Sequence, residues 1–291
     1  MPIFQKPSQV VIKESEYRLF RDYIAKNSGI VIPEEKTYLL ETRLSKHMAQ
    51  AGIDSFGKFY DYIIADKSRQ VMQKIINAIT TNETKWFRDA EPWSILENFI
   101  LPSLINDLTT GRKKRIRIWS AASSSGQEIY STVMCVDNYL SHNNILGVKL
   151  SDFDFFATDI SGDVLEIAKK GRYDKISMAR GLSDYYKDKY FTQNGNAWDI
   201  NDKIKNAVTF APFNLQNSFN NFEKFDIIFC RYILIYFSDE LKEEIVQKMY
   251  DVLNDEGIVF TGIYALLDVF LKYFESNSFG NTTYYLKKRE I

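Results

Sequence analysis

The chain has 291 residues, of which 45% are hydrophobic and 15% aromatic, a composition that is typical of a globular protein and excludes a disordered one. Its 37 basic and 38 acidic residues nearly cancel, so no overall positive field would attract nucleic acid. No signal sequence is recognisable and no apolar run reaches about 18 residues, so we expect a cytoplasmic protein without membrane insertion.

Residues 1–78 are predicted to form a small all-α domain. Apolar residues recur at three- and four-residue spacing in four stretches, Glu14–Lys26, Pro33–Gln50, Ser55–Ala65 and Ser68–Ala78. Arg43, Lys46 and His47 share the second stretch, in a domain that carries 12 basic and nine acidic residues. They would form either an ordinary solvated helix face or a surface for an acidic partner helix.

Residues 79–92 are predicted to be a linker, and residues 93–291 a second domain in which strands alternate with helices. The strands are expected near 115–121, 154–159, 208–211, 225–230 and 257–262, and the helices between them include Asp239–Leu253. That alternation favours a mostly parallel sheet covered by helices on both faces. Turn signals and mixed aromatic and polar residues predict a small antiparallel insert at about 190–211.

Polar side chains follow three of the predicted strands. Arg231 interrupts the apolar run 225–237, which ends near Tyr236, and Asp159 closes the strand 155–158, with Ser161 as a predicted helix N-cap. A loop of small residues, 120–126, leads from another strand into a helix. Ligands of open α/β sheets bind outside the carboxyl ends of the strands, and an acidic residue after the second strand typically accepts hydrogen bonds from ribose hydroxyls. The sequence therefore indicates a nucleoside site, although it lacks the G-x-G-x-x-G pattern of dinucleotide-binding proteins.

The residues that most often bind metals or act as nucleophiles are few. The two cysteines, Cys135 and Cys230, fall in apolar patterns and are expected to be buried free thiols. The two histidines, His47 and His142, are far apart in the sequence and accompany no cysteine cluster. We therefore expect neither a metal site nor a histidine-dependent catalytic triad.

Five motifs occur in order along the chain: ITTNETKWFRD (79–89), WSAASSSGQEIYS (119–131), FFATDISGDVLEIAKKGRYD (155–174), FNLQ (213–216) and FDIIFCRYILIYF (225–237). This set resembles the chemotaxis receptor methyltransferases, the CheR family, over about residues 12–285. The resemblance implies a Rossmann-like S-adenosylmethionine-dependent methyltransferase domain with a small antiparallel β insert, preceded by a small all-α domain. It also implies methyl transfer to glutamate side chains on the cytoplasmic helices of chemoreceptors, with S-adenosylhomocysteine as the second product.

The resemblance further implies roles for individual residues. The cofactor would contact Asn82, Thr84, Arg88, Glu128, Asp159, Asn214, Leu215, Arg231 and Tyr232. Arg88 would also orient the substrate glutamate and Tyr236 would lie near the methyl group, so both are candidate catalytic residues. Arg43 and Lys46 would face the receptor. The protein is expected to act as a monomer.

The sequence departs from the family pattern at three places. Tyr232 stands where the family usually has Asn, Ile129 where it has Pro, and Gly262-Ile263-Tyr264-Ala265 where it commonly reads Gly-His-Ser-Glu. These changes motivate an alternative, a catalytically weak or inactive relative that binds the cofactor or the receptor without turnover. A methyltransferase for a small molecule or for RNA is a second alternative, and the absence of a basic field disfavours RNA.

Overall fold

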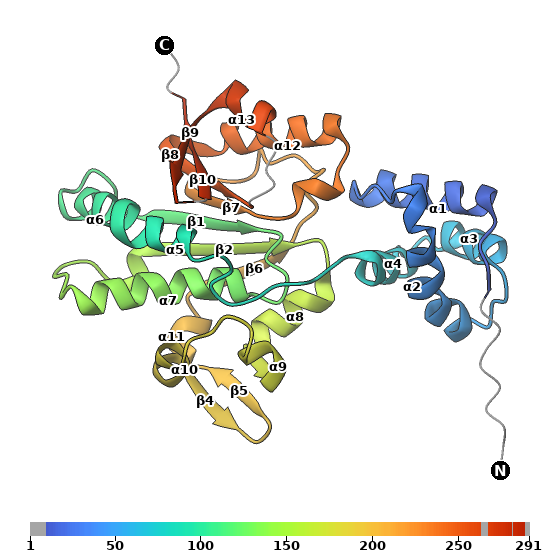
Figure 1. Cartoon of the computed structure of the whole chain (residues 1–291), viewed down its shortest axis with the longest axis horizontal. Helices are drawn as coiled ribbons and strands as arrows, with labels where there is room; N and C mark the ends of the chain where they lie inside the picture. Colours follow the sequence, from blue (N-terminus) through green and yellow to red (C-terminus); the bar gives the residue numbers. More distant parts are fainter. Residues whose placement is uncertain (1–9, 263–266, 281, 289–291) are drawn as a thin grey trace. The chain divides into compact units, whose positions relative to one another are not determined.

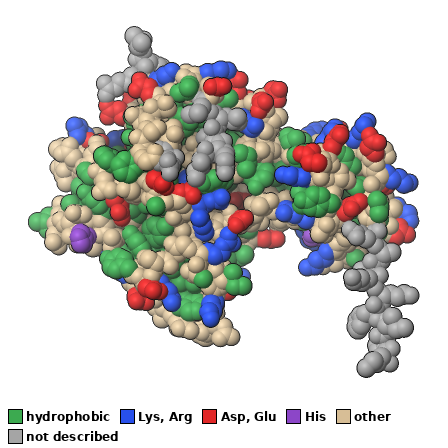
Figure 2. Space-filling view, in the orientation of Figure 1, with side chains coloured by type: hydrophobic (Ala, Val, Ile, Leu, Met, Phe, Trp, Pro, Cys, Tyr) green, Lys and Arg blue, Asp and Glu red, His purple; other side chains and the backbone are tan. Residues whose placement is uncertain are grey.

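The computed structural model describes residues 10–262, 267–280 and 282–288. Contacts divide the chain into two compact units (Figure 1). One is a helical unit that extends to Thr81 and includes Tyr236–Ser238, and the other is an α/β unit that begins at Asn82 and contains the remaining residues. Figure 2 shows acidic and basic side chains interspersed over the visible face of each unit, in keeping with a net charge of −1.

From residue 10 to Thr81, the helical unit consists of four helices and a short 3-10 turn, close to the four predicted stretches. They are α1 (Glu14–Ser28), η1 (Glu34–Lys36), α2 (Thr37–Gln50), α3 (Phe56–Ala65) and α4 (Gln70–Ile79). Gly29 ends α1 in the left-handed conformation (φ 76°), and the Ser55 side chain accepts a hydrogen bond from the Lys58 amide at the start of α3. The core is formed by fully buried aromatic and aliphatic side chains, including Phe20, Leu40, Leu44, Phe56 and Ile75.

A seven-stranded sheet forms the centre of the α/β unit, with the order β6-β2-β1-β7-β8-β10-β9. The strands are β1 (Ile116–Ala121), β2 (Phe153–Asp159), β6 (Val208–Pro212), β7 (Phe225–Cys230), β8 (Leu253–Thr261), β9 (Phe274–Phe279) and β10 (Thr282–Lys287). The first five are parallel to one another, as predicted, and all six residues of β7 are buried. The antiparallel strands β10 and β9 extend the sheet beyond the last predicted strand.

Helices connect these strands and supply most of the remaining apolar core. They are α5 (Glu91–Ile95), the π-helical turn η2 (Leu96–Ile100), α6 (Leu101–Thr109), α7 (Gln127–His142), η3 (Leu150–Asp152), α8 (Gly162–Lys170), η4 (Leu234–Tyr236), α12 (Asp239–Asp251) and α13 (Leu267–Tyr273). Helix α7 is buried along most of its length, which explains why its sequence lacks a clear polar face.

The antiparallel insert begins earlier in the chain, and also ends earlier, than the sequence predicted. A three-stranded sheet has the order β3-β5-β4, formed by β3 (Arg172–Asp174), β4 (Phe191–Asn194) and β5 (Ala197–Ile200). Figure 1 shows it with the short helices α9 (Lys175–Met178), α10 (Asp184–Tyr190) and α11 (Asp202–Lys205) at one side of the main sheet. Residues 208–211, which the sequence predicts both as a main-sheet strand and as the end of the insert, lie in β6, which pairs with β2 in the main sheet.

Cys135 and Cys230 are buried free thiols, as predicted. Burial raises the pKa of both thiols, so they stay protonated at neutral pH. Within the described ranges, no helix combines the length and the apolar character that crossing a membrane requires.

Candidate functional site

The topology of the main sheet creates a switch point between β1 and β7. From β1 the chain proceeds to β2 and β6 on one side, and β7 then pairs with the other side of β1. Because these strands are parallel, their carboxyl ends lie at one edge of the sheet. Ligands of doubly wound sheets bind outside such an edge at the switch point. Asp159 is the last residue of β2, and Glu128 and Arg231 follow β1 and β7, so the fold places these sequence-predicted residues around this point.

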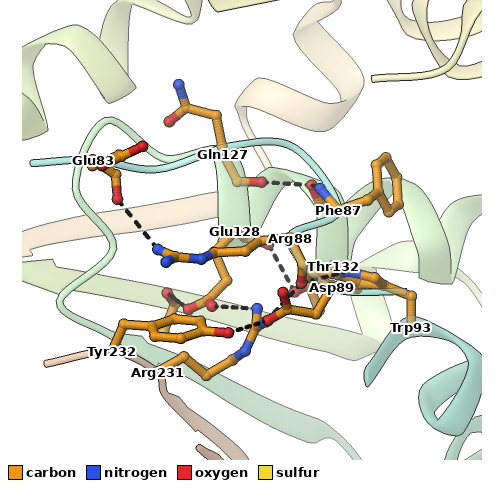
Figure 3. Close-up of polar contacts among 12 residues, drawn as sticks. Glu83, Phe87, Arg88, Asp89, Trp93, Gln127, Glu128, Thr132, Arg231 and Tyr232 are labelled. Carbon is orange, nitrogen blue, oxygen red and sulfur yellow. Dashed lines mark hydrogen bonds and ion pairs between the residues drawn. The ribbon is translucent and has the colours of Figure 1, made fainter. Parts of the chain in front are cut away.

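The Arg231 side chain is the centre of a buried polar cluster (Figure 3). Its side chain is only 1% exposed, and its two terminal nitrogens donate to Glu128 Oε2 at 3.0 Å and to Asp89 Oδ2 at 2.5 Å. The second of these nitrogens also donates to the Arg88 carbonyl at 2.6 Å. Two carboxylates therefore neutralise one buried guanidinium, the arrangement that buried ion pairs require for stability.

Glu128 lies in the first turn of α7 and both of its carboxylate oxygens make contacts. Ser120 Oγ donates to its Oε1 at 2.8 Å, while Oε2 pairs with Arg231. The positive end of the α7 dipole also favours a carboxylate here. Each carboxylate oxygen can accept a further hydrogen bond, so Glu128 retains acceptor capacity for a ligand ammonium group.

Asp159 organises the loop that follows β1. Its two oxygens accept hydrogen bonds from the backbone amides of Ser124 (2.8 Å) and Ser161 (2.9 Å). Burial raises the pKa of Asp159, and these backbone hydrogen bonds oppose that shift. The carboxylate thus holds a loop residue, Ser124, in the left-handed conformation (φ 51°) and still has free acceptor positions.

Two buried hydroxyls beside Asp159 match the needs of a polar ligand such as S-adenosylmethionine. Ser123 Oγ and Ser161 Oγ are buried and have no hydrogen-bond partner in the described part of the chain. Ser161 occupies the predicted N-cap position of α8, but its side chain does not cap the helix. A buried polar group without a partner costs about 1–3 kcal/mol, so hydroxyl or amino groups of a ligand would stabilise both serines.

A single glycine shapes this loop. Gly126 has φ 92°, and an added Cβ would lie 3.0 Å from the Ala168 Cβ of α8. Only glycine therefore allows the loop after β1 to approach α8 so closely while adopting this conformation. The residues present fit the cofactor: Asp159 and the two serines offer groups for ribose hydroxyls, and Glu128 offers a carboxylate for the methionine ammonium.

The segment from Asn82 to Asp89, which precedes β1 in the sequence, also reaches this cluster. The Asn82 carbonyl accepts a hydrogen bond from Ser124 Oγ at 3.0 Å, whereas its side chain is exposed, and Thr84 is half-buried. Trp86 anchors the segment, because its indole donates to the Ser177 carbonyl at 3.1 Å and its amide donates to the Arg180 carbonyl at 3.0 Å. The structure thus brings the backbone of this segment to the loop after β1.

Arg88 and Tyr232 lie against each other in the same cluster (Figure 3). The Arg88 guanidinium carbon is 3.6 Å from the centroid of the Tyr232 ring, and the Tyr232 hydroxyl donates to Asp89 Oδ2. Arg88 Nη1 also makes a long contact of 3.4 Å with the Glu83 carbonyl. Among the described residues, Arg88 forms no ion pair, which leaves its charge available to an anionic group.

Asn214 and Leu215 follow β6 and are linked to Asp159. The Phe213 amide donates to the Asp159 carbonyl at 2.9 Å, and Asn214 Oδ1 accepts from the Gln216 amide at 3.0 Å in a tight turn. Leu215 is 6% exposed. The turn therefore places a polar and an apolar residue directly after the strand that neighbours β2.

Three predicted site residues belong to the helical unit. Tyr236 is grouped with it by contacts, and its carbonyl accepts a hydrogen bond from the Val31 amide at 2.8 Å. Arg43 Nη1 donates to the carbonyls of Ile79 (2.6 Å) and Thr80 (3.1 Å), so this side chain caps the end of α4. Lys46 is exposed on α2. Of the two predicted receptor contacts, Lys46 is exposed and Arg43 is half-buried.

Sequence reasoning missed Asp89, Ser123 and Ser161 as site residues. Asp89 stands at the end of a motif that had been recognised, and the signal for it was Arg231 in a buried strand, which requires a carboxylate partner. Of the departures from the family pattern, Tyr232 is described by the structure, whereas Ile263–Ala265 lie outside the described residues. No group of three or more histidine, cysteine or acidic side chains that could hold a metal occurs in the portion described.

Comparison with known proteins identifies both parts of the chain. Residues 82–278 match the family model "CheR methyltransferase, SAM binding domain", and residues 15–80 match "CheR methyltransferase, all-alpha domain". The chain is 39% identical to chemotaxis protein methyltransferase Cher2 of Pseudomonas putida over 85% of this chain and 88% of that protein. It is 40% identical to chemotaxis protein methyltransferase 1 of Pseudomonas aeruginosa over 85% and 89%, and 31% identical to chemotaxis protein methyltransferase 2 of Vibrio cholerae over 96% and 95%.

These matches agree with the predicted fold of an all-α domain followed by a methyltransferase domain, and with the predicted cofactor. The seven-stranded sheet and the three-stranded insert both lie within the region that the S-adenosylmethionine-binding model covers. The chain belongs to the CheR family of chemotaxis methyltransferases, and S-adenosylmethionine is its cofactor.

Proposed function

We propose that this protein transfers the methyl group of S-adenosylmethionine to glutamate side chains on the cytoplasmic helices of chemoreceptors, acting as a monomer in the cytoplasm. The observation that carries the proposal is the cluster of Glu128, Arg231, Asp89 and Arg88 beside Asp159 at the switch point of a CheR-type domain. The relatives named chemotaxis protein methyltransferases support the choice of a chemotaxis protein as substrate.

The proposed reaction places modest demands on the protein. The cofactor supplies an activated methyl group, and a glutamate side chain is already ionised at neutral pH, so no general base is needed. The protein has to hold the two reactants about 3–3.5 Å apart and exclude water. These tasks fit a site built from hydrogen-bond acceptors and one available guanidinium.

We assign the tasks as follows. Asp159 binds the cofactor ribose, Glu128 binds its ammonium group, and Asn214 with Leu215 contacts the adenine. Arg231 orients Glu128 through their 3.0 Å ion pair. Arg88 binds a carboxylate, either that of the cofactor or that of the substrate, and Tyr236 approaches the methyl group. Asn82, Thr84 and Tyr232 complete the wall of the cofactor site.

The test is transfer of labelled methyl from S-adenosylmethionine to purified chemoreceptor cytoplasmic fragments. Glutamate methyl esters hydrolyse in base, so the label should be released as methanol, and fragments whose methylatable glutamates are replaced by alanine should stay unlabelled. Tight binding of S-adenosylhomocysteine without transfer to any fragment would favour the binding-only alternative. Base-stable labelling, or labelling of RNA or a small molecule, would contradict glutamate as the acceptor.

Lys46 and Arg43 should behave differently when each is replaced by alanine. Lys46→Ala is expected to weaken binding of an acidic receptor fragment by up to about 1 kcal/mol, roughly fivefold, without changing the melting temperature, because an exposed charge acts by screened attraction. Arg43→Ala is expected to destabilise the helical unit by about 1.5–3 kcal/mol, because the carbonyls at the end of α4 lose a charged donor. Calorimetric titration and thermal unfolding measure the two effects.

Lys58→Ala on α3 is the matched control for Lys46, because Lys58 is also an exposed lysine of the helical unit. His47 should not contribute charge to the binding surface, since burial, with smaller effects from Lys46 and Lys74, lowers the pKa of His47. Equal losses of receptor-fragment affinity for the Lys46 and Lys58 variants would contradict a receptor surface centred on Lys46. An affinity that does not change with salt concentration would contradict it as well.

A further inference from the structure

Tyr232 stands out because its backbone is strained and its ring contacts several charged groups. It has φ 60°, a left-handed conformation that is costly for a residue with a bulky side chain, and Asp89 is also left-handed, with φ 59°. The Tyr232 hydroxyl and Asp89 Oδ2 form a hydrogen bond that links these two residues across 143 positions of sequence. Such conformations persist when the surroundings fix them, and here the surroundings are side chains of the candidate site.

The ring of Tyr232 serves as a platform for the Arg88 guanidinium. A distance of 3.6 Å from the guanidinium carbon to the ring centroid is a close cation–π contact, whereas Arg231 lies farther away at 5.6 Å. Arg231 is already neutralised by Glu128 and Asp89. The Tyr232 ring therefore stacks on Arg88, the arginine of the cluster that forms no ion pair among the described residues.

Gly262, at the end of β8, permits the ring to occupy this position. A Cβ added at Gly262 would lie 2.7 Å from Tyr232 Cδ1 and Cε1, closer than such atoms approach in proteins. Any other residue at 262 would therefore displace the ring unless the backbone moved. Asp89 holds the hydroxyl end of Tyr232, and the bare backbone at Gly262 accommodates the side of its ring.

We propose that Tyr232 is a positioning residue that holds the Arg88 guanidinium, which forms no ion pair within the described ranges, by stacking, in the place where it binds a carboxylate during methyl transfer. Asp89 and Gly262 fix the ring, and the ring fixes Arg88. The assignment of a carboxylate as the ligand rests on the proposed function, whereas the positioning of Arg88 by Tyr232 does not.

The positioning can be tested without any reaction by side-chain NMR of the Arg88 guanidinium group. In the unchanged protein, the Arg88 Nε–H proton is expected to show an upfield ring-current shift, identified by its loss in Arg88→Lys. Tyr232→Leu should abolish that shift, Tyr232→Phe should retain most of it, and Gly262→Ala should reduce it by displacing the ring. An Arg88 signal that is identical in the unchanged protein and in Tyr232→Leu would overturn the proposal, whatever the protein methylates.

A double-mutant cycle tests whether positioning matters for function. Tyr232→Leu is expected to weaken S-adenosylhomocysteine binding about 3- to 30-fold if Arg88 binds the cofactor carboxylate, or to raise the KM for the receptor fragment similarly if it binds the substrate. In an Arg88→Ala background, the same change should have almost no further effect on either constant. Tyr232→Phe should restore most of the loss, because the ring remains.

Tyr185→Leu is the matched control, because Tyr185 is an exposed tyrosine that also lies near a cation, with Lys189 Nζ 5.5 Å from its ring centroid. It should leave both constants unchanged. If the fold-loss of the double variant equals the product of the losses for Tyr232→Leu and Arg88→Ala, Tyr232 acts independently of Arg88. If the unchanged protein binds S-adenosylhomocysteine but methylates no receptor fragment, the proposed function fails, and the NMR result still decides the positioning.

Discussion

Replacement of Arg231 by methionine is expected to lower the free energy of unfolding of the α/β unit by about 3–5 kcal/mol. The change removes the only guanidinium that pairs, within the described structure, with both Glu128 and Asp89, whose side chains are 12% and 16% exposed. Two mostly buried carboxylates would then face each other without a counter-charge. Methionine keeps the unbranched apolar stem of arginine but is shorter, so some loss of packing adds to the loss of the counter-charge.

Urea unfolding followed by tryptophan fluorescence measures this loss selectively. The four tryptophans, Trp86, Trp93, Trp119 and Trp198, all belong to the α/β unit. Arg115→Met is the matched control, because Arg115 forms an exposed ion pair with Asp154 at 2.8 Å and should cost less than about 1 kcal/mol. Equal destabilisation by the two variants would contradict the structural role assigned to the Arg231 cluster.

Replacement of Asp159 by alanine is expected to weaken S-adenosylhomocysteine binding by about 1.5–3 kcal/mol, roughly 10- to 150-fold. Two causes act together. The ribose hydroxyls lose a charged acceptor, and the amides of Ser124 and Ser161 lose the carboxylate that shapes the cofactor loop. Isothermal titration calorimetry measures the affinity. An affinity within twofold of the unchanged protein would exclude Asp159 from the cofactor site.

The pKa of Asp159 adds a pH dependence to this expectation. Burial raises its pKa in the folded protein, so the folded state binds a proton more tightly than the unfolded chain. The ionised group therefore opposes folding above its folded pKa, and this penalty disappears as the pH falls through that value. If the ionised form of Asp159 binds the cofactor ribose, as we propose, cofactor affinity should weaken on acidification at a higher pH than an ordinary carboxylate would cause. Asp159→Asn should not show that part of the pH dependence.

The sequence indicated the parts of the fold whose local patterns are strong. Helical periodicity in 14–78 and the apolar runs of β1, β2 and β7 gave the correct element types, because burial on one face or on both faces leaves a direct trace in the residue order. The same reasoning missed β9, whose residues Phe274–Phe279 are mostly exposed. An edge strand with little buried area carries little periodic signal, and its pairing with β10 defines it.

The insert shows the same limit on a smaller scale. Strand β3 has only three residues, Arg172–Asp174, and pairs with β5, whose residues follow 23 or more positions later. The pair of Arg172 and Asp199, 2.8 Å apart across these strands, could not be identified from either segment alone. The stretch 208–211 is predicted from the sequence both as a main-sheet strand and as the end of the insert, and its parallel pairing with β2 decides for the main sheet.

By itself, the sequence determined that one buried strand ends directly before Arg231 and that an acidic residue, Asp159, closes another strand. Only the tertiary structure decided which groups these residues meet. Arg231 is bonded to Asp89 and Tyr232 is bonded to Asp89 across 142 and 143 positions of sequence, and Arg88 stacks on the Tyr232 ring. The physical reason is that apolar burial follows a local period along the chain, whereas the pairing of charges depends on which strand ends the sheet brings together.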